Sequence, residues 1–247
     1  ATTDLAQDLR ASTFHPPTLD FLDKLGIAEQ LVEQGLICKH WQFRDRNTGI
    51  VASFDLSLLK GETKFPFRLQ CEQWKLTKAL RTYIEGHPDG ELITRTSAEE
   101  VGQNDDGVWV KTIDKDGCKN QYDGRFLIGS DGARSIVRKS INAKFEGMTI
   151  PEIFLVLSTN FQYEKAIPDL ANIAYISDPD EWLVLLKTLS LWRVLLATNP
   201  EHSEDFIMDP ENVQKRLQAV IPSANPYEVV HKTAYKVHER VSDKYIE

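Results

Sequence analysis

Apolar residues recur at helical spacing in four stretches of the chain. They predict helices near residues 17–25, 28–34, 73–85 and 210–220. Pro17 suits the first turn of the first helix, and Gly26 is expected to end it. In the last stretch, Asp209 comes just before Pro210 and is expected to cap the helix. We therefore expect amphipathic helices that each bury one face.

Alternating apolar and polar residues predict strands in much of the remaining chain. Residues 39–59 are typical of a β-hairpin turning at Asn47-Thr48-Gly49, and residues 91–126 of a β-meander with tight turns at 104–107 and 114–117. After Asn142, strand-like runs cover residues 153–161, 173–176, 182–189, 191–197 and 227–241. The second half of the chain is thus expected to form a mixed sheet.

A glycine-bearing turn lies between these two regions. The apolar run Phe126–Ile128 predicts a short strand, and Gly129-Ser130-Asp131-Gly132 predicts a tight turn whose backbone approaches a ligand. Ser135 and Arg138 follow at helical spacing, which directs both side chains back toward the turn. A helix start favours anions, and a guanidinium adds a fork for phosphate. The stretch favours phosphate binding, although a bare Asp-Gly is more often turn chemistry alone.

Composition and charge narrow the class of protein. The chain has 247 residues, of which 41% are hydrophobic, and a net charge of −8, which argues against a nucleic-acid partner. Its three cysteines are far apart and include no C-x-x-C pair, so a reducing, cytoplasmic location is expected. The first ten residues are polar and resemble no signal peptide. Lys187 and Arg193 interrupt the most apolar stretch, so no membrane span is expected.

The glycine-bearing turn carries the most specific signal. The string from Gly129 to Arg138, GSDGARSIVR, resembles the G-[AS]-D-G-x-x-S-x-[VL]-R motif of FAD-dependent aromatic hydroxylases, the para-hydroxybenzoate hydroxylase-like flavoprotein monooxygenases. The resemblance implies that this string binds FAD and also serves NADPH or NADH. The implied cofactor residues in the string are Gly129, Asp131, Gly132, Ser135 and Arg138.

Two further segments resemble the same family. Residues 10–26 resemble the R-A-x-x-x-x-P-x-x-x-x-x-L-x-x-L-G segment, which implies that Arg10 reaches the FAD pyrophosphate. Gln70 stands where the hydroxylases carry a glutamine that hydrogen-bonds the ribityl and phosphate region of the flavin. A polar residue before a helix is more often a cap than a ligand, so Gln70 is the weaker match.

The resemblance implies an α/β protein with the para-hydroxybenzoate hydroxylase-like FAD/NAD(P)-binding fold. Its cofactor domain, with a mostly parallel sheet, would be incomplete here, and a mixed β-sheet would form the substrate domain. Residues 1–37 and 68–145 would belong to the FAD-binding domain, and residues 38–67 and 146–247 to the substrate-binding domain. The implied activity is hydroxylation of an aromatic, phenolic small molecule with NAD(P)H and O2. A homodimer is a possible oligomeric state.

One expected feature of a dinucleotide-binding fold is missing. None of the 13 glycines forms a G-x-G pair, and no second Gly-Asp motif follows residue 235. We therefore expect an internal fragment of a longer flavoprotein, inactive alone, that binds FAD weakly or not at all.

Within the substrate domain, Arg193 is a candidate partner for a substrate carboxylate, because an arginine is costly to bury unpaired. Aromatic residues there suit a flat ring, but most are expected to be core.

Other classes of protein match less well. The sequence has no G-x-S-x-G elbow, no H-E-x-x-H spacing and no EF-hand register, so a hydrolase or a metal site is not expected. A reductase or a halogenase of the same flavoprotein fold remains an alternative, because such proteins share the Asp-Gly string. A binding or scaffold module without cofactor is the non-enzymatic alternative, favoured by the missing glycine pair.

Overall fold

The computed structural model describes residues 5, 7, 9, 11–179 and 181–246. The chain divides into two compact units. The meander unit comprises Ala1–Leu5, Ile84–Ile150 and His238–Glu247, and the sheet unit comprises Ala6–Tyr83 and Pro151–Val237. The division cuts helix α3 (Gln73–Glu85) after Tyr83, strand β9 (Phe145–Thr159) after Ile150 and strand β13 (Val229–Ser242) after Val237. This division into compact units does not test the boundaries of the predicted FAD-binding and substrate-binding domains, which stay a prediction.

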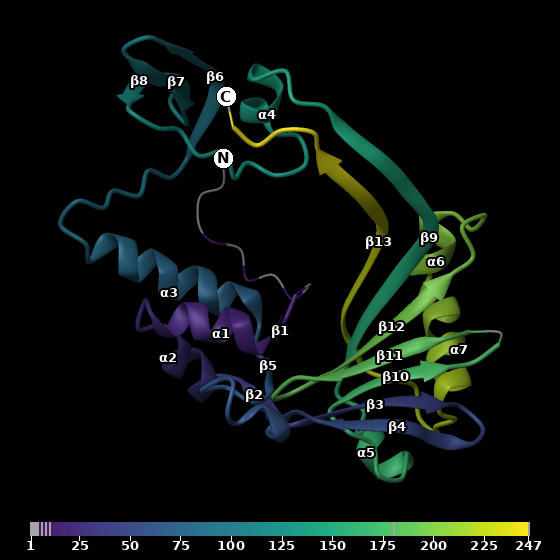
Figure 1. The fold of residues 1–247 in the computed structure, drawn as a ribbon. Helices are drawn as coiled ribbons and strands as arrows, with labels where there is room; N and C mark the ends of the chain where they lie inside the picture. The colour runs from purple at the N-terminus through teal and green to yellow at the C-terminus, as the bar shows by residue number, and fades with distance from the viewer. Residues whose placement is uncertain (1–4, 6, 8, 10, 180, 247) are drawn as a thin grey trace. The chain divides into compact units, whose positions relative to one another are not determined.

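The first part of the sheet unit is a small helical layer. It contains α1 (Pro16–Asp23), α2 (Ala28–Glu33) and α3 (Gln73–Glu85), which confirms the three predicted helices. Gly26 ends the first of them with a φ of 69°. Beside them, β1 (Thr13–Phe14), β5 (Arg68–Gln70) and β2 (Leu36–Cys38) form a three-stranded antiparallel sheet (Figure 1). The expected parallel cofactor sheet is therefore absent from the described residues.

A seven-stranded mixed sheet forms the rest of the unit. Its strand order is β13-β9-β12-β11-β10-β3-β4. The β3–β10 pair is parallel, whereas the β9–β12, β11–β12, β10–β11 and β3–β4 pairs are antiparallel. The remaining strands are β3 (His40–Asp45), β4 (Gly49–Asp55), β10 (Ile173–Ser177), β11 (Leu183–Lys187) and β12 (Trp192–Thr198). The predicted hairpin and mixed sheet are confirmed. A 3-10 turn, η1 (Leu56–Leu59), follows the hairpin.

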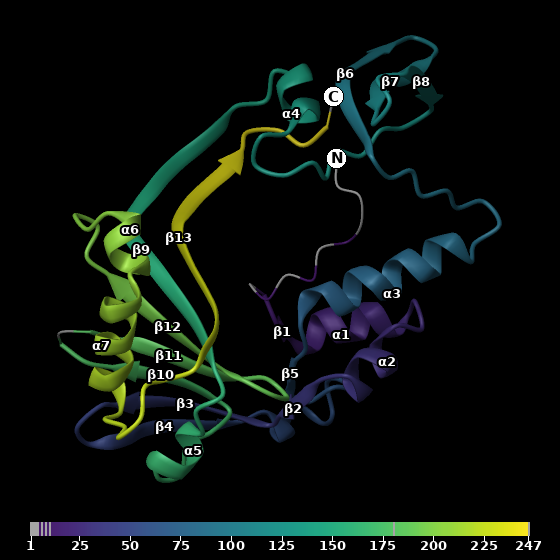
Figure 2. The same cartoon turned by 180° about the vertical axis from the view of Figure 1, so that it is seen from behind.

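The two faces of this sheet differ in their cover. One face packs against α7 (Pro210–Val220), α6 (Glu204–Met208) and α5 (Tyr163–Ala166), with Leu155, Leu185 and Leu217 fully buried between them (Figure 2). Asp209 caps α7 as predicted, because its Oδ1 accepts from the amides of Glu211 and Asn212. The opposite face, called the open face below, carries Phe43 and Tyr175, since side chains alternate along each strand.

The meander unit contains the predicted three-stranded meander. Strands β6 (Thr96–Asn104), β7 (Gly107–Asp114) and β8 (Lys119–Gly124) pair in sequence, and a short helix, α4 (Ile136–Ser140), follows them. Asn104 and Asp114 accept backbone hydrogen bonds in the two tight turns, which confirms the turn chemistry.

The predicted strand at Phe126–Ile128 is wrong for the described residues. Strand β8 ends at Gly124, and Phe126 and Ile128 are 83% and 86% exposed. A strand requires a neighbouring ladder, and no described residue pairs with this segment. Apolar composition alone therefore does not make a strand.

The sequence patterns did not predict several short helices and strands. These are β1, β2, β5, α5 and α6, none longer than five residues, and the first part of β9, which begins at Phe145 rather than at 153. A two- or three-residue strand contains at most one repeat of the alternation, so only its pairing partner defines it.

Candidate functional site

The loop after β8 folds around two capping side chains. Asp131 Oδ2 accepts from the amide of Ile136 at 2.7 Å, and Ser135 Oγ accepts from the amide of Arg138 at 2.9 Å. Burial alone would raise the pKa of Asp131, but hydrogen bonds from the Ser135 side chain and the Ile136 amide outweigh it and hold the pKa below its ordinary value. The first amides of α4 are thus occupied by the protein's own acceptors, and the five-residue helix offers little dipole to a ligand.

The same loop still has donors to offer. Apart from the Asp131 amide, which bonds its own carboxylate, no backbone amide of residues 130–134 donates a hydrogen bond to another described residue, and these residues are exposed. Gly132 has a φ of 78° and open space around the position of a Cβ. Gly129 serves packing instead, because an added Cβ would lie 2.6 Å from Val137 Cβ. Consecutive exposed N–H groups suit an anionic, acceptor-rich group such as a diphosphate.

Arg138 is held against its own unit. Its Nη1 donates to the carbonyl oxygen of Ala133 at 3.0 Å, and its guanidinium lies 4.3 Å from the ring centroid of Phe145. These contacts fix the cation beside the loop. A role in phosphate binding stays a prediction.

Gln70 lies in the sheet unit and is enclosed by hydroxyl groups. Its Oε1 accepts from Ser12 Oγ at 3.0 Å, and its Nε2 donates to Thr13 Oγ1 at 3.0 Å. Gln70 is 1% exposed and Ser12 is 4% exposed. The backbone of Ser12 is also fixed, because its carbonyl oxygen accepts from the amide of Cys71 at 2.7 Å. No motif marked Ser12, which precedes β1 and meets Gln70 only in the folded chain.

Arg193 belongs to the same polar group. It is 3% exposed in β12, and its Nη1 donates to Ser12 Oγ at 2.9 Å. Its charge acts on Glu72, which is ion-paired with Lys75: burial raises the pKa of that carboxyl, but Lys75 and the charge of Arg193 keep the pKa below its ordinary value. A role of Arg193 as a substrate-carboxylate partner stays a prediction, and its bond to buried Ser12 favours a different role.

The predicted cofactor residues therefore form two groups in two units. Gly129, Asp131, Gly132, Ser135 and Arg138 lie in one loop of the meander unit, whereas Gln70 lies with Arg193 in the sheet unit. Arg10 falls outside the described residues. The expectation that Arg10 reaches the FAD pyrophosphate accordingly stays a prediction.

The open face of the sheet carries a group of aromatic rings. Trp41 stacks on Phe54 at 4.2 Å between ring centroids, and Tyr175 lies 5.5 Å from Phe43. Phe43 and Phe54 are more than 40% exposed, so these rings are not core. Trp192, by contrast, is core, as expected for most aromatic residues of this half.

Two buried polar atoms on strands β9 and β13 have no hydrogen-bond partner among the described residues. They are Ser158 Oγ and His231 Nδ1. Ser158 lies directly opposite Arg193 in the β9–β12 ladder. Sequence patterns gave no sign of either atom.

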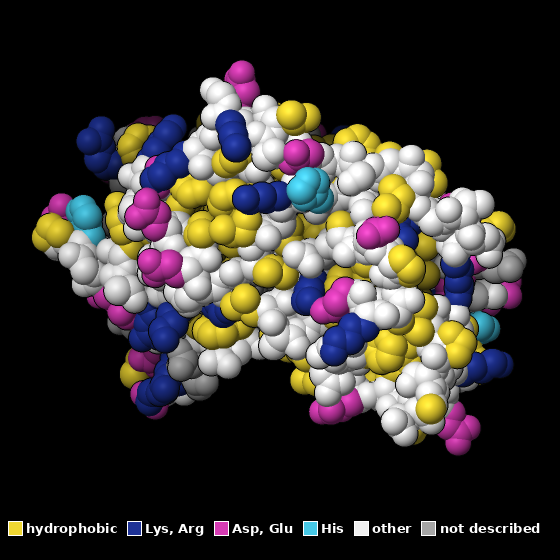
Figure 3. Space-filling view, turned by 90° about the horizontal axis from the view of Figure 1, so that it is seen from below, with side chains coloured by type: hydrophobic (Ala, Val, Ile, Leu, Met, Phe, Trp, Pro, Cys, Tyr) yellow, Lys and Arg dark blue, Asp and Glu magenta, His cyan; other side chains and the backbone are white. Residues whose placement is uncertain are grey.

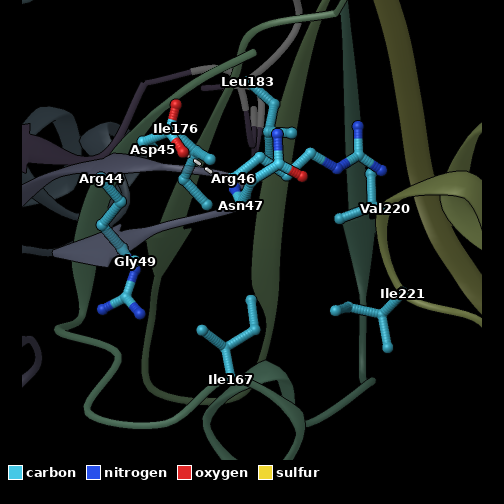
Figure 4. A pocket seen from close by; sticks show the side chains of 10 residues that line it. All are labelled: Arg44, Asp45, Arg46, Asn47, Gly49, Ile167, Ile176, Leu183, Val220 and Ile221. Carbon is cyan, nitrogen blue, oxygen red and sulfur yellow. Dashed lines mark hydrogen bonds between the residues drawn. The ribbon is translucent and has the colours of Figure 1, made fainter.

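A separate hollow lies on the helix-covered side of the sheet. It has a volume of about 260 Å³ and lies among Arg44, Arg46 and apolar residues that include Ile167 and Val220 (Figure 4). Arg44 donates to the carbonyl oxygen of Pro168, and Arg46 pairs with Asp178. None of the predicted site residues lines this hollow.

Other kinds of site find no support in the described part of the chain. Its histidine, cysteine and acidic side chains form no group that could hold a metal ion. No described helix is long and apolar enough to cross a membrane. The face in Figure 3 mixes acidic, basic and hydrophobic side chains without one dominant block of Lys and Arg. Cys38, Cys71 and Cys118 are all free thiols.

Comparison with known proteins gives a consistent result. A family model described as "FAD binding domain" matches residues 1–247. Para-nitrophenol 4-monooxygenase from Pseudomonas sp. (strain WBC-3) is 29% identical over 96% of this chain. The 6-hydroxy-3-succinoylpyridine 3-monooxygenase HspB from Pseudomonas putida (strain DSM 28022 / S16) is 28% identical over 95% of it. The chain spans 59% of the length of each of these two relatives.

A solved structure agrees with the sequence relatives. The crystal structure of p-nitrophenol 4-monooxygenase PnpA from Pseudomonas putida DLL-E4 superposes with a TM-score of 0.90 at 25% identity, over 99% of this chain and 62% of that chain. Aklavinone-11 hydroxylase, crystallised with FAD and aklavinone, shares the fold with a TM-score of 0.80 at 20% identity. The predicted α/β hydroxylase fold is thereby confirmed.

Proposed function

Because the chain belongs to the family of FAD-binding domains, we propose that it is part of a flavoprotein monooxygenase that hydroxylates an aromatic, phenolic small molecule with NAD(P)H and O2. The relatives that it matches over nearly its whole length are monooxygenases by name. The observation that carries the proposal is the loop at Asp131, with its run of exposed amides and its match to the hydroxylase motif.

The donor set of the chain fits FAD. The amides of residues 130–134 suit the diphosphate, and the open space at Gly132 permits close approach of the backbone. We assign Gly129, Asp131, Ser135 and Arg138 the task of holding this loop in shape, since each packs or bonds within it. Arg10 and Gln70 are proposed as further contacts to the cofactor.

The chemistry divides between cofactor and chain. When bound, FAD accepts hydride from NADPH or NADH and passes oxygen from O2 to the ring of the substrate. The chain binds and orients the partners and excludes water. We place the aromatic substrate on the open face, because Phe43 and Phe54 are exposed there beside the half-buried ring of Tyr175.

The proposal is tested with the full-length protein that contains this chain. We expect the purified protein to carry one FAD, and para-nitrophenol or phenol to stimulate its NAD(P)H oxidation and to yield a hydroxylated product detected by mass spectrometry. Bound FAD without any hydroxylated product would instead favour a same-fold reductase or halogenase. A protein without flavin that cannot be reconstituted would favour a scaffold. A cytoplasmic location and a homodimer stay predictions.

A further inference from the structure

Three buried polar side chains from distant parts of the sheet unit form a continuous chain of hydrogen bonds. Arg193 Nη1 lies 2.9 Å from Ser12 Oγ, which lies 3.0 Å from Gln70 Oε1. None of the three residues is more than 4% exposed. Arg193 comes from the large mixed sheet, whereas Gln70 belongs to the small sheet beside the helical layer and Ser12 directly precedes a strand of that small sheet. These hydrogen bonds therefore connect the seven-stranded mixed sheet to Gln70, a proposed cofactor residue.

The chemistry of the groups fixes the direction of these bonds. A guanidinium has only donors, so Ser12 Oγ must accept from Arg193. The single hydroxyl hydrogen of Ser12 then goes to the other neighbour, the side-chain amide of Gln70. The structure places the oxygen of Gln70 toward Ser12, and an amide NH2 group in its place would leave this hydrogen without an acceptor. The orientation of the amide thus follows from the charge on Arg193.

The remaining hydrogens of Gln70 define what it can bind. Its Nε2 carries two hydrogens, and one of them is donated to Thr13 Oγ1 at 3.0 Å. The carbonyl oxygen of Gln70 is already engaged by Ser12 at 3.0 Å, and Thr13 Oγ1 also lies 3.2 Å from it. A ligand group that reaches this side chain is therefore offered an N–H donor.

We propose that Arg193 is a positioning residue of the cofactor site, acting through Ser12 to hold Gln70 as a donor toward an acceptor group of FAD such as a phosphate or ribityl oxygen. This inference rests on the proposed function only in naming FAD as the ligand. It replaces a direct role for Arg193 in binding a substrate carboxylate with an indirect role in binding the cofactor. The orientation of the Gln70 amide is a property of the chain itself.

The first test measures the NMR signals of the Gln70 side-chain amide in the absence of any cofactor. In the full-length protein labelled with ¹⁵N-glutamine, the side-chain NH2 signals of Gln70 are assigned from their loss in Q70L. We expect R193M and S12A to shift these signals and to speed their hydrogen exchange several-fold, whereas S12T, which keeps a hydroxyl, moves them less. Signals that stay at their wild-type positions in both R193M and S12A would overturn the proposal.

The second test measures FAD affinity with a matched control. Arg44 is also a buried arginine of the mixed sheet, 6% exposed, but it bonds Gln42 and the carbonyl oxygens of Pro168 and Asp169 instead. Loss of one charge-assisted hydrogen bond predicts about tenfold weaker FAD binding in R193M. R44M should change the affinity less than twofold at a comparable loss of stability, and R193K should recover part of the binding because it keeps a donor.

The two tests separate the inference from the proposed function. Equal losses of FAD affinity in R193M and R44M would mean that Arg193 acts only through general stability, and the positioning role would be wrong. If the wild-type protein binds no FAD, the proposed function fails, and the Gln70 amide signals still decide whether Arg193 orients this side chain.

Discussion

At the scale of single residues, Asp131 illustrates how a motif residue serves local structure. Its carboxylate accepts hydrogen bonds from the backbone amides of Ile136 and Val137 and so caps α4. The motif therefore needs an aspartate for its own fold, whether or not the carboxylate meets a cofactor. Burial works against the charged form of Asp131, but hydrogen bonds from the Ser135 side chain and from these amides outweigh it and lower the pKa of the carboxyl.

Replacement of Asp131 by alanine should loosen the loop. We expect D131A to cost about 1 kcal/mol of local stability, the usual value for a lost cap, and to speed exchange of the Ile136 amide about fivefold in the full-length protein. Because the folded pKa lies below the unfolded value of about 3.9, this stabilisation is fully present above that pH. The difference between D131A and wild type should therefore shrink as the pH falls through the folded pKa.

The control for D131A is D105A in the exposed turn between β6 and β7. Asp105 is an exposed aspartate in the same unit, so its removal changes the charge in the same way. We expect D105A to leave exchange of the Ile136 amide unchanged. Equal effects of the two variants would show that charge, and not capping, explains the result.

At the scale of elements, two glycines of one loop have different reasons to be glycine. Gly129 lies where a Cβ would meet Val137 of α4 at 2.6 Å, whereas Gly132 has open space but a φ of 78°. The first is a constraint of packing between the loop and the helix, and the second is a constraint of backbone conformation.

The two constraints predict different responses to a second substitution. We expect G129A to lower the free energy of unfolding by about 1–3 kcal/mol through overpacking, and V137A to relieve part of this loss in the double variant. G132A should cost about 1 kcal/mol from its left-handed φ, and V137A should not relieve it. Urea unfolding of the three single and two double variants checks this, and additive losses for G129A and V137A would contradict the packing argument.

At the scale of the whole molecule, the donors for a dinucleotide are few. The sequence has no G-x-G pair, and the described amides that suit a diphosphate are those of residues 130–134. We therefore expect residues 1–247 by themselves to bind FAD much more weakly than the full-length protein. Flavin fluorescence quenching during titration measures this, and a tight yellow one-to-one complex of residues 1–247 would contradict it.

The long helices, the hairpin and the protein family could be predicted because each depends on a pattern of residues that are close together in the sequence. The spacing of Leu19 and Leu22 places both in the core, and the string from Gly129 to Arg138 led to the family that the comparisons confirm. Phe126 and Ile128 show the limit of this reasoning. Their apolar character predicted a strand, but a strand depends on a neighbour that composition does not supply.

The sequence by itself determined the fold family and the candidate loop, because short-range periodicity and a contiguous motif carry that information. Only the tertiary structure decided the surroundings of Arg193, whose partner Ser12 lies 181 residues away along the chain. It also decided which aromatic rings lie on the open face, since sheet register sets the side on which each side chain emerges. Contacts between distant residues follow from the packing of strands, and no local pattern of residues encodes them.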